Sequence, residues 1–149
     1  DQNLSYADKY NVVFEMHRCD EPVYMMVDPH RFNQALTNVL SNAAKFSKDG
    51  GLVKVSVENQ KDHKFRIVVQ DWGIGIPKSF QSKIYEKFTQ ADGSSTRAAG
   101  GSGLGLSIAK TIIEAFDGEV HMQSEEGVGT EISFVLRKSA AQQLERNVA

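Results

Sequence analysis

Cysteine, long apolar runs and a strong charge of either sign are all scarce in this sequence, and each scarcity excludes a class of protein. The 149 residues contain one cysteine, Cys19, which excludes an internal disulfide and a zinc site built from several cysteines. No apolar run approaches the roughly 20 residues that a membrane-spanning helix needs. The formal net charge of -2 predicts no general attraction to nucleic acid or anionic lipid. We therefore expect a cytoplasmic domain that contacts neither nucleic acid nor a membrane directly, although its parent protein can be membrane-anchored.

The remaining composition is that of an ordinary globular chain, with 40% hydrophobic and 24% charged residues. At this length we expect a single domain around one core. The polar opening, residues 1–11, lacks a signal-peptide pattern and predicts a linker from an upstream domain. The polar end, residues 138–149, predicts a tail or a linker to another module.

The first third of the chain predicts a strand followed by a helix. Residues 12–17 alternate apolar and polar side chains, and the apolar run at 23–27 is a candidate to pair beside them across a turn. Asp28 and Pro29 are typical of an N-cap and a first helical residue, and the helical pattern continues to about Phe46. One face of this helix is an apolar stripe of Phe32, Leu36, Val39, Leu40 and Ala43.

A second stripe of the same helix is polar and lies about 120° from the apolar one. It consists of Gln34, Asn38, Asn42 and Lys45. A solvated helix face explains such a stripe. A functional alternative is that the carboxamide oxygens suit Mg²⁺, which prefers oxygen ligands and shares the phosphates of a nucleotide, while the lysine neutralises phosphate charge. The helix alone leaves both interpretations open.

The alternation at 53–58 and 65–70 predicts an antiparallel hairpin whose second strand ends at Asp71. Glycines follow two and four positions later, at Gly73 and Gly75. A tight turn capped by an aspartate explains this pattern. A carboxylate that accepts a hydrogen bond from an adenine amine in a desolvated pocket explains it equally well.

A glycine-rich segment with glycines at 100, 101, 103 and 105 runs into a helical apolar pattern. Its backbone N–H groups and the positive end of the following helix suit an anion such as a phosphate, but a flexible loop has the same composition. The stretch before it, residues 78–102, shows little regular pattern and is long for so compact a domain. A connection of this length is typical of a lid that covers a bound ligand.

The helix after the glycines runs from about 103 to 116, and its apolar breadth predicts burial against a sheet. We expect Gly118 to be the C′ residue that ends it. Alternation at 119–123 and 132–136 then predicts a second hairpin. The solvent-facing stripe of the helix is predicted to be Ser107, Lys110, Glu114 and Asp117.

These motifs, in this order, resemble the catalytic and ATP-binding domain of sensor histidine kinases, hybrid kinases included, within the ATPase superfamily shared with DNA gyrase, MutL and the large heat-shock chaperone. The match covers roughly residues 12–137, the expected extent of the domain. Each motif is weak alone, but five at separations that fit one pocket are highly specific. The five segments are the N box (38–47), the first glycine box (71–75), the F box (85–90), the second glycine box (101–106) and the last glycine box (127–130).

The resemblance implies an α/β two-layer sandwich of the Bergerat type, with a mixed sheet of about five strands packed against three helices, and ATP and Mg²⁺ as cofactors. It implies that Asn42 ligates Mg²⁺ with support from Asn38 and that Lys45 meets the phosphates, so that Asn42 and Lys45 are the catalytic residues. Asp71 is implied to fix the adenine amine, helped by Thr130 through a water. The other implied nucleotide-binding residues are Phe46, Gly73, Gly75, Ile76, Gly101, Ser102, Gly103, Leu104, Gly105 and Leu106.

The activity that the resemblance implies is transfer of the ATP γ-phosphoryl group to a histidine on a separate helical dimerisation domain, for relay to a response regulator or receiver domain. Ser41 stands where the hydrolytic relatives have a glutamate that activates water, which argues against an ATP-driven conformational machine. A nucleotide-binding switch without chemistry is the alternative. We expect the acceptor histidine outside this chain, because none of its own has the family's following acid and proline: His17, His30, His63 and His121.

Overall fold

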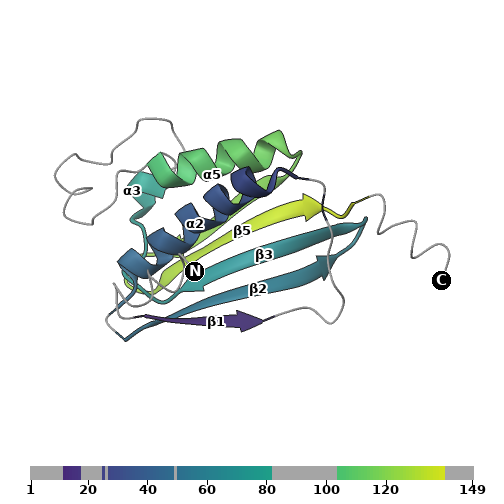
Figure 1. The fold of residues 1–149 in the computed structure, drawn as a ribbon. Helices are drawn as coiled ribbons and strands as arrows, with labels where there is room; N and C mark the ends of the chain where they lie inside the picture. Colours follow the sequence, from purple (N-terminus) through teal and green to yellow (C-terminus); the bar gives the residue numbers. More distant parts are fainter. Residues whose placement is uncertain (1–11, 18–24, 26, 49, 82–103, 140–149) are drawn as a thin grey trace.

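The computed structural model describes residues 12–17, 25, 27–48, 50–81 and 104–139. Five strands form one mixed sheet, and two long helices cover one of its faces (Figure 1). The α/β two-layer sandwich expected from the sequence is therefore confirmed. The elements are β1 (Val13–His17), α2 (Pro29–Phe46), β2 (Leu52–Gln60), β3 (Lys64–Asp71), α3 (Lys78–Gln81), α5 (Leu104–Ala115), β4 (Glu119–Glu125) and β5 (Gly129–Arg137).

The strands lie in the order β1-β2-β3-β5-β4. The pairs β2–β3 and β4–β5 are the two predicted hairpins, and antiparallel pairing of β3 with β5 joins them. β1 pairs in parallel with β2, with Phe14 opposite Val53, a partner that the sequence does not predict. Most of the run at 23–27, the expected partner, lies outside the described residues. Of that run, Met25 and Val27 are described and lie in no strand. Parallel neighbours need a crossover, and here α2 provides it, which the alternation of β1 alone does not reveal.

Helix α2 begins and ends where the sequence predicts. The Asp28 carboxylate caps it by accepting hydrogen bonds from the backbone N–H groups of His30 at 2.9 Å and Arg31 at 3.4 Å. At the other end, the Ser47 hydroxyl donates to the Ala43 carbonyl at 2.7 Å. The predicted apolar stripe packs into the core, with Val39, Leu40 and Ala43 buried and Phe32 and Leu36 partly buried.

Helix α5 packs against α2 as well as against the sheet, and this double contact changes which of its residues are buried. Ser107, predicted to face solvent, is only 5% exposed, so that prediction is wrong. Ile108, although apolar, is 38% exposed. The buried apolar residues of the helix are Leu106, Ala109, Ile112 and Ile113.

The C-terminal end of α5 is a Schellman motif displaced by one residue from the prediction. The Gly118 N–H donates to the Ile113 carbonyl at 2.9 Å, and the Asp117 N–H donates to the Glu114 carbonyl at 3.0 Å. Asp117 has the left-handed conformation of a C′ residue, with φ 60°. Gly118 is therefore the residue after C′. A glycine is still needed there, because a Cβ on it would lie 2.8 Å from an Ile113 methyl group.

Several predicted features lie outside the described residues: Cys19, the F box at 85–90 and the predicted lid beyond residue 81. So do Gly101, Ser102 and Gly103 of the second glycine box. The short helix α3 occupies the start of the predicted lid, where the sequence predicts no regular structure. No helix in the described part of the chain has the length and apolar content that crossing a membrane requires.

Candidate nucleotide-binding site

Several segments from distant parts of the chain meet at one end of the sandwich: the end of β3, the start of β5, α3, the C-terminal end of α2 and the N-terminal end of α5 (Figure 1). Backbone hydrogen bonds fix this meeting point. The Ile74 N–H donates to the Phe46 carbonyl at 3.1 Å, which joins the end of α2 to the segment after β3. The Gly127 N–H donates to the Ile74 carbonyl at 2.7 Å, which adds the β4–β5 turn.

Asp71, the last residue of β3, is a buried carboxylate at this end of the sheet and is 6% exposed. Its Oδ1 accepts a hydrogen bond from the Gly73 N–H at 2.9 Å, and the backbone N–H of Thr130 also bonds its carboxyl group. Burial raises the pKa of the Asp71 carboxyl above its ordinary value, and these two backbone bonds oppose that rise. The carboxylate is thus desolvated and held in one orientation, as a specific hydrogen-bond acceptor requires.

Asp71 belongs to a row of polar side chains that crosses three strands. It stands directly opposite Thr130 on β5, which in turn stands opposite Ser124 on β4. Directly paired residues share a face of the sheet, and this face is the one that packs against the helices. The neighbouring rows on that face are apolar: Val69 with Ile132, Ile67 with Phe134, and Phe65 with Leu136.

We call Asp71, Thr130 and Ser124 the polar row. The sequence predicts the first two as site residues and misses Ser124. A signal for it exists, since Ser124 is the next inward position of β4 after Val120 and Met122, where a third apolar residue is expected.

The glycines of the first glycine box allow backbone segments to touch. A Cβ on Gly73 would lie 1.9 Å from the Phe46 carbonyl oxygen. A Cβ on Gly75, whose φ is 71°, would lie 2.1 Å from the Glu125 carbonyl oxygen. Directly before Gly73, Trp72 turns its side chain outward and is 43% exposed, as alternation after the inward-facing Asp71 requires.

The polar stripe of α2 reaches the same end of the molecule. Asn38, Asn42 and Lys45 are half-buried, and the side chains of Asn42 and Lys45 make no hydrogen bond or ion pair to another described residue. Gln34, farther from this end, is exposed. Ser41 is buried, and its hydroxyl donates to the Asn38 carbonyl at 3.1 Å, so it is directed into its own helix.

The remaining predicted site residues that the structure describes lie at the same end. Leu104, Gly105 and Leu106 form the first turn of α5, whose backbone N–H groups have no partner within the helix. The C-terminal end of α5 lies at the far end of β5, because a Cβ on Gly118 would approach Leu136. Ile76 is half-buried, and its N–H donates to the Ser124 hydroxyl at 2.8 Å.

Comparison with known proteins identifies the family to which this arrangement belongs. Residues 27–140 match the family model described as histidine kinase-, DNA gyrase B- and HSP90-like ATPase. The chain belongs to this ATPase family. It is an ATP-binding domain of the type found in sensor histidine kinases.

Individual relatives agree with this assignment. The domain is 40% identical over 127 residues to the sensor histidine kinase WalK of Bacillus subtilis, a match covering 85% of this chain but only 21% of WalK. Among solved structures, a mycobacterial sensor histidine kinase, MprB, matches with a TM-score of 0.76 and 28% identity, covering 93% of this chain and 91% of that one. Full-length ShkA in complex with AMPPNP matches with a TM-score of 0.76 and 27% identity, covering 91% of this chain and 27% of that one. The domain thus spans about a fifth of WalK and about a quarter of ShkA.

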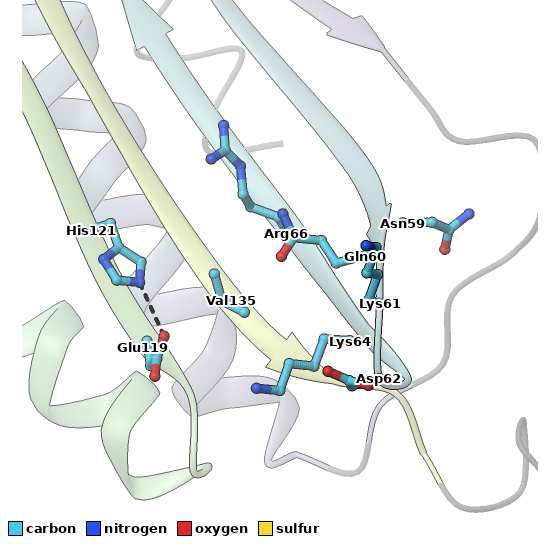
Figure 2. Close-up of a pocket in the computed structure, with 9 residues that line it drawn as sticks. All are labelled: Asn59, Gln60, Lys61, Asp62, Lys64, Arg66, Glu119, His121 and Val135. Atoms are coloured by element: carbon cyan, nitrogen blue, oxygen red, sulfur yellow. Dashed lines mark hydrogen bonds and ion pairs between the residues drawn. The ribbon is translucent and has the colours of Figure 1, made fainter.

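The face of the sheet that points away from the helices carries a separate hollow of about 790 Å³ near the β2–β3 turn (Figure 2). Its lining includes none of the predicted nucleotide-binding residues and carries charges of both signs. Arg66 in this hollow lies between Glu58 and Glu131. Its Nε is 3.3 Å from a Glu58 oxygen, an ion-pair distance without hydrogen-bond geometry, and its Nη2 is 3.4 Å from a Glu131 oxygen. Cross-strand ion pairs of this kind suit a solvated sheet face.

Proposed function

We propose that this domain binds Mg-ATP and transfers the γ-phosphoryl group to a histidine that lies outside the chain. The observation that carries the proposal is that a buried hydrogen-bond acceptor, Asp71, lies at the same end of the fold as the half-buried Asn42 and Lys45. The names of the relatives support it, because WalK and MprB are sensor histidine kinases and ShkA has been seen in complex with AMPPNP.

In this proposal the polar row binds the base. Asp71 accepts a hydrogen bond from the exocyclic amine of adenine, and Thr130 assists through a water. Gly73 and Gly75 let the surrounding backbone close around this carboxylate. Phe46 and Ile76 lie beside the base or the sugar.

The phosphates are proposed to lie between α2 and the N-terminal end of α5. The free N–H groups of the first helical turn and the positive end of the helix dipole attract the phosphate chain, with Gly101 to Leu106 as its cradle. Lys45 neutralises phosphate charge.

Magnesium is proposed to bind the Asn42 carboxamide oxygen, with Asn38 in support. The donor chemistry fits, because a neutral amide oxygen is a hard ligand of the kind that Mg²⁺ takes beside oxygens from phosphates and water. When bound, Mg²⁺ withdraws charge from the transferring phosphoryl group.

In the reaction, an imidazole nitrogen attacks the γ-phosphorus. The new N–P bond forms as the bond to the bridging oxygen breaks, and ADP leaves. The residues of this chain position the nucleotide and neutralise its charge. Because the Ser41 hydroxyl is bonded to a backbone carbonyl and is no base, water activation is disfavoured and transfer prevails.

The proposed context is a cytoplasmic part of a sensor kinase. Residues 1–11 are proposed to link it to the dimerisation domain that carries the acceptor histidine, and 12–137 to form the catalytic domain. A response regulator or a receiver domain then takes the phosphoryl group. The proposed tail, 138–149, begins with Lys138, whose N–H donates to the His63 carbonyl at 2.7 Å.

The decisive experiment supplies γ-labelled ATP and Mg²⁺ to the chain alone, and then to the chain with a sensor-kinase helical domain in trans. We expect acid-labile label on the added domain only, and none when the chain carries Asn42→Ala. Acid-labile label on the isolated chain contradicts the placement of the acceptor. ATP binding without label on either partner contradicts the kinase and favours a nucleotide switch.

A further inference from the structure

Ser124 makes three hydrogen-bond contacts through a single hydroxyl group. Its Oγ lies 2.8 Å from the backbone nitrogen of Ile76, 3.1 Å from the carbonyl oxygen of Gly129, and 2.8 Å from the Oγ1 of Thr130. A hydroxyl has one proton to donate and two lone pairs with which to accept. The three contacts therefore use its full hydrogen-bonding capacity.

The direction of each bond follows from its partner. The Ile76 N–H can only donate, and the Gly129 carbonyl can only accept, so the single proton of Ser124 goes to Gly129. Thr130 must then donate its own proton to Ser124. Because its proton is used in this bond, the Thr130 hydroxyl can only accept a hydrogen bond from any further group.

The acceptor on Thr130 lies next to the acceptor on Asp71. The two residues are directly paired, and both side chains are on the helix-facing side of the sheet. An ionised Asp71 also only accepts. A water held between these two acceptors donates both of its protons to them, and so presents only lone pairs to a ligand.

We propose that Ser124 is a positioning residue that sets the hydrogen-bond polarity of Thr130, so that the nucleotide site selects a 6-aminopurine and rejects a 6-oxopurine. A 6-amino group donates two protons toward these acceptors, whereas a 6-oxo group places a third acceptor against them, which is a desolvated mismatch. This inference rests on the proposed function, since it concerns the base recognised by the same site.

The segment around Ser124 is held in place by α3. The side-chain nitrogen of Gln81 lies 2.8 Å from the Ile76 carbonyl oxygen and 3.1 Å from the Ser124 carbonyl oxygen. The Gln81 carboxamide therefore holds the Ile76 segment against the Ser124 segment, and the contact between these two segments helps to decide which group receives the Ser124 proton. Ile76 and Gln81, which lie outside the polar row, thus help to set the direction of the hydrogen bonds within it.

The test compares ATP with inosine triphosphate, which differs only by the 6-oxo group and the N1 proton. Calorimetry with the parent chain is expected to show at least about 30-fold tighter binding of ATP. Ser124→Ala frees the Thr130 proton to face a 6-oxo group, and is expected to lower this ratio about 5- to 10-fold. Ser133→Ala is the matched control, because Ser133 is a buried serine of β5 on the other face of the sheet, and it should keep the parent ratio.

A second variant shows whether Ser124 acts through Thr130. Thr130→Val removes the acceptor and is expected to lower the ratio by itself, after which adding Ser124→Ala has no further effect. An unchanged ratio in Thr130→Val overturns the proposal even if Ser124→Ala does not fold. An unchanged ratio in a folded Ser124→Ala also overturns it. Failure of the parent to bind either nucleotide counts instead against the proposed function.

Discussion

Gly73 and Phe46 approach so closely that a Cβ on Gly73 would lie 1.9 Å from the Phe46 carbonyl oxygen. Ile74, the next residue, donates its N–H to that same oxygen at 3.1 Å. This contact sets the end of α2 against the segment that follows Asp71. It therefore fixes the position of the proposed metal-binding helix relative to the proposed base-binding carboxylate.

Gly73→Ala is expected to lower the free energy of unfolding by about 1–3 kcal/mol, because the added methyl group forces backbone atoms apart. The loss should appear in urea unfolding followed by the fluorescence of Trp72, the single tryptophan. Gly50→Ala is the control. Gly50 has a left-handed φ of 74°, which Gly73 does not, yet nothing lies within 4 Å of its added Cβ. A smaller loss for Gly73→Ala than for Gly50→Ala would contradict the steric argument.

Asn42→Ala is expected to lower the affinity for ATP in the presence of Mg²⁺ by at least about tenfold, since even the indirect partners of metal ions have effects of that size. In EDTA the variant and the parent should bind ATP alike. Asn33→Ala is the matched control, because it makes the same change on an exposed position of the same helix. Equal magnesium dependence in the two variants would remove Asn42 from the site.

The stability of the domain is expected to depend on pH through Asp71. Burial raises its pKa in the folded chain, so the folded state holds this proton more tightly than the unfolded state does. Between the ordinary carboxyl pKa and the raised one, the free energy of unfolding falls as pH rises, by at most about 1.4 kcal/mol per pH unit. The parent should therefore gain stability relative to Asp71→Asn as pH is lowered through this window. Urea unfolding at a series of pH values measures the difference, and a constant difference refutes the linkage.

Asp117→Gly is expected to raise the free energy of unfolding by about 0.5–1 kcal/mol, because glycine adopts the left-handed C′ conformation without a Cβ clash. Asp117→Ala, which lacks both the freedom of glycine and the local bonding of aspartate, should be less stable than the parent. The two midpoints in urea are compared directly. A glycine variant no more stable than the alanine variant would show that the C′ position carries no strain.

The sequence predicts most of this fold because the signals involved are local. The cap at Asp28, the alternation of the two hairpins and the acid at the end of β3 each depend on a few adjacent residues. The pairing of β1 with β2 is not predicted, because strand pairing depends on where α2 crosses the sheet. The burial of Ser107 is missed for a similar reason: contact with both α2 and the sheet leaves the exposed stripe of α5 at Ile108, Thr111, Glu114 and Ala115.

The candidate site was predicted from single residues and motifs, whereas its organisation depends on pairing across strands. Asp71 and Thr130 could be named from the sequence through a family resemblance. Their placement side by side, and the contact of Thr130 with Ser124, depend on the registers of β3, β5 and β4. Hydrogen-bond direction within such a row has no sequence signal at all.

The order β1-β2-β3-β5-β4 also bears on how the domain folds. Each hairpin can form from nearby residues, but the seam between β3 and β5 closes only when the two hairpins meet across the intervening chain. Asp71 and Thr130 face each other across that seam, so their shared acceptor geometry does not exist before it closes. A nucleotide that binds both residues stabilises only the state in which β3 and β5 are paired. Its kinetic effect should therefore fall mainly on the rate of unfolding, with the rate of folding nearly unchanged.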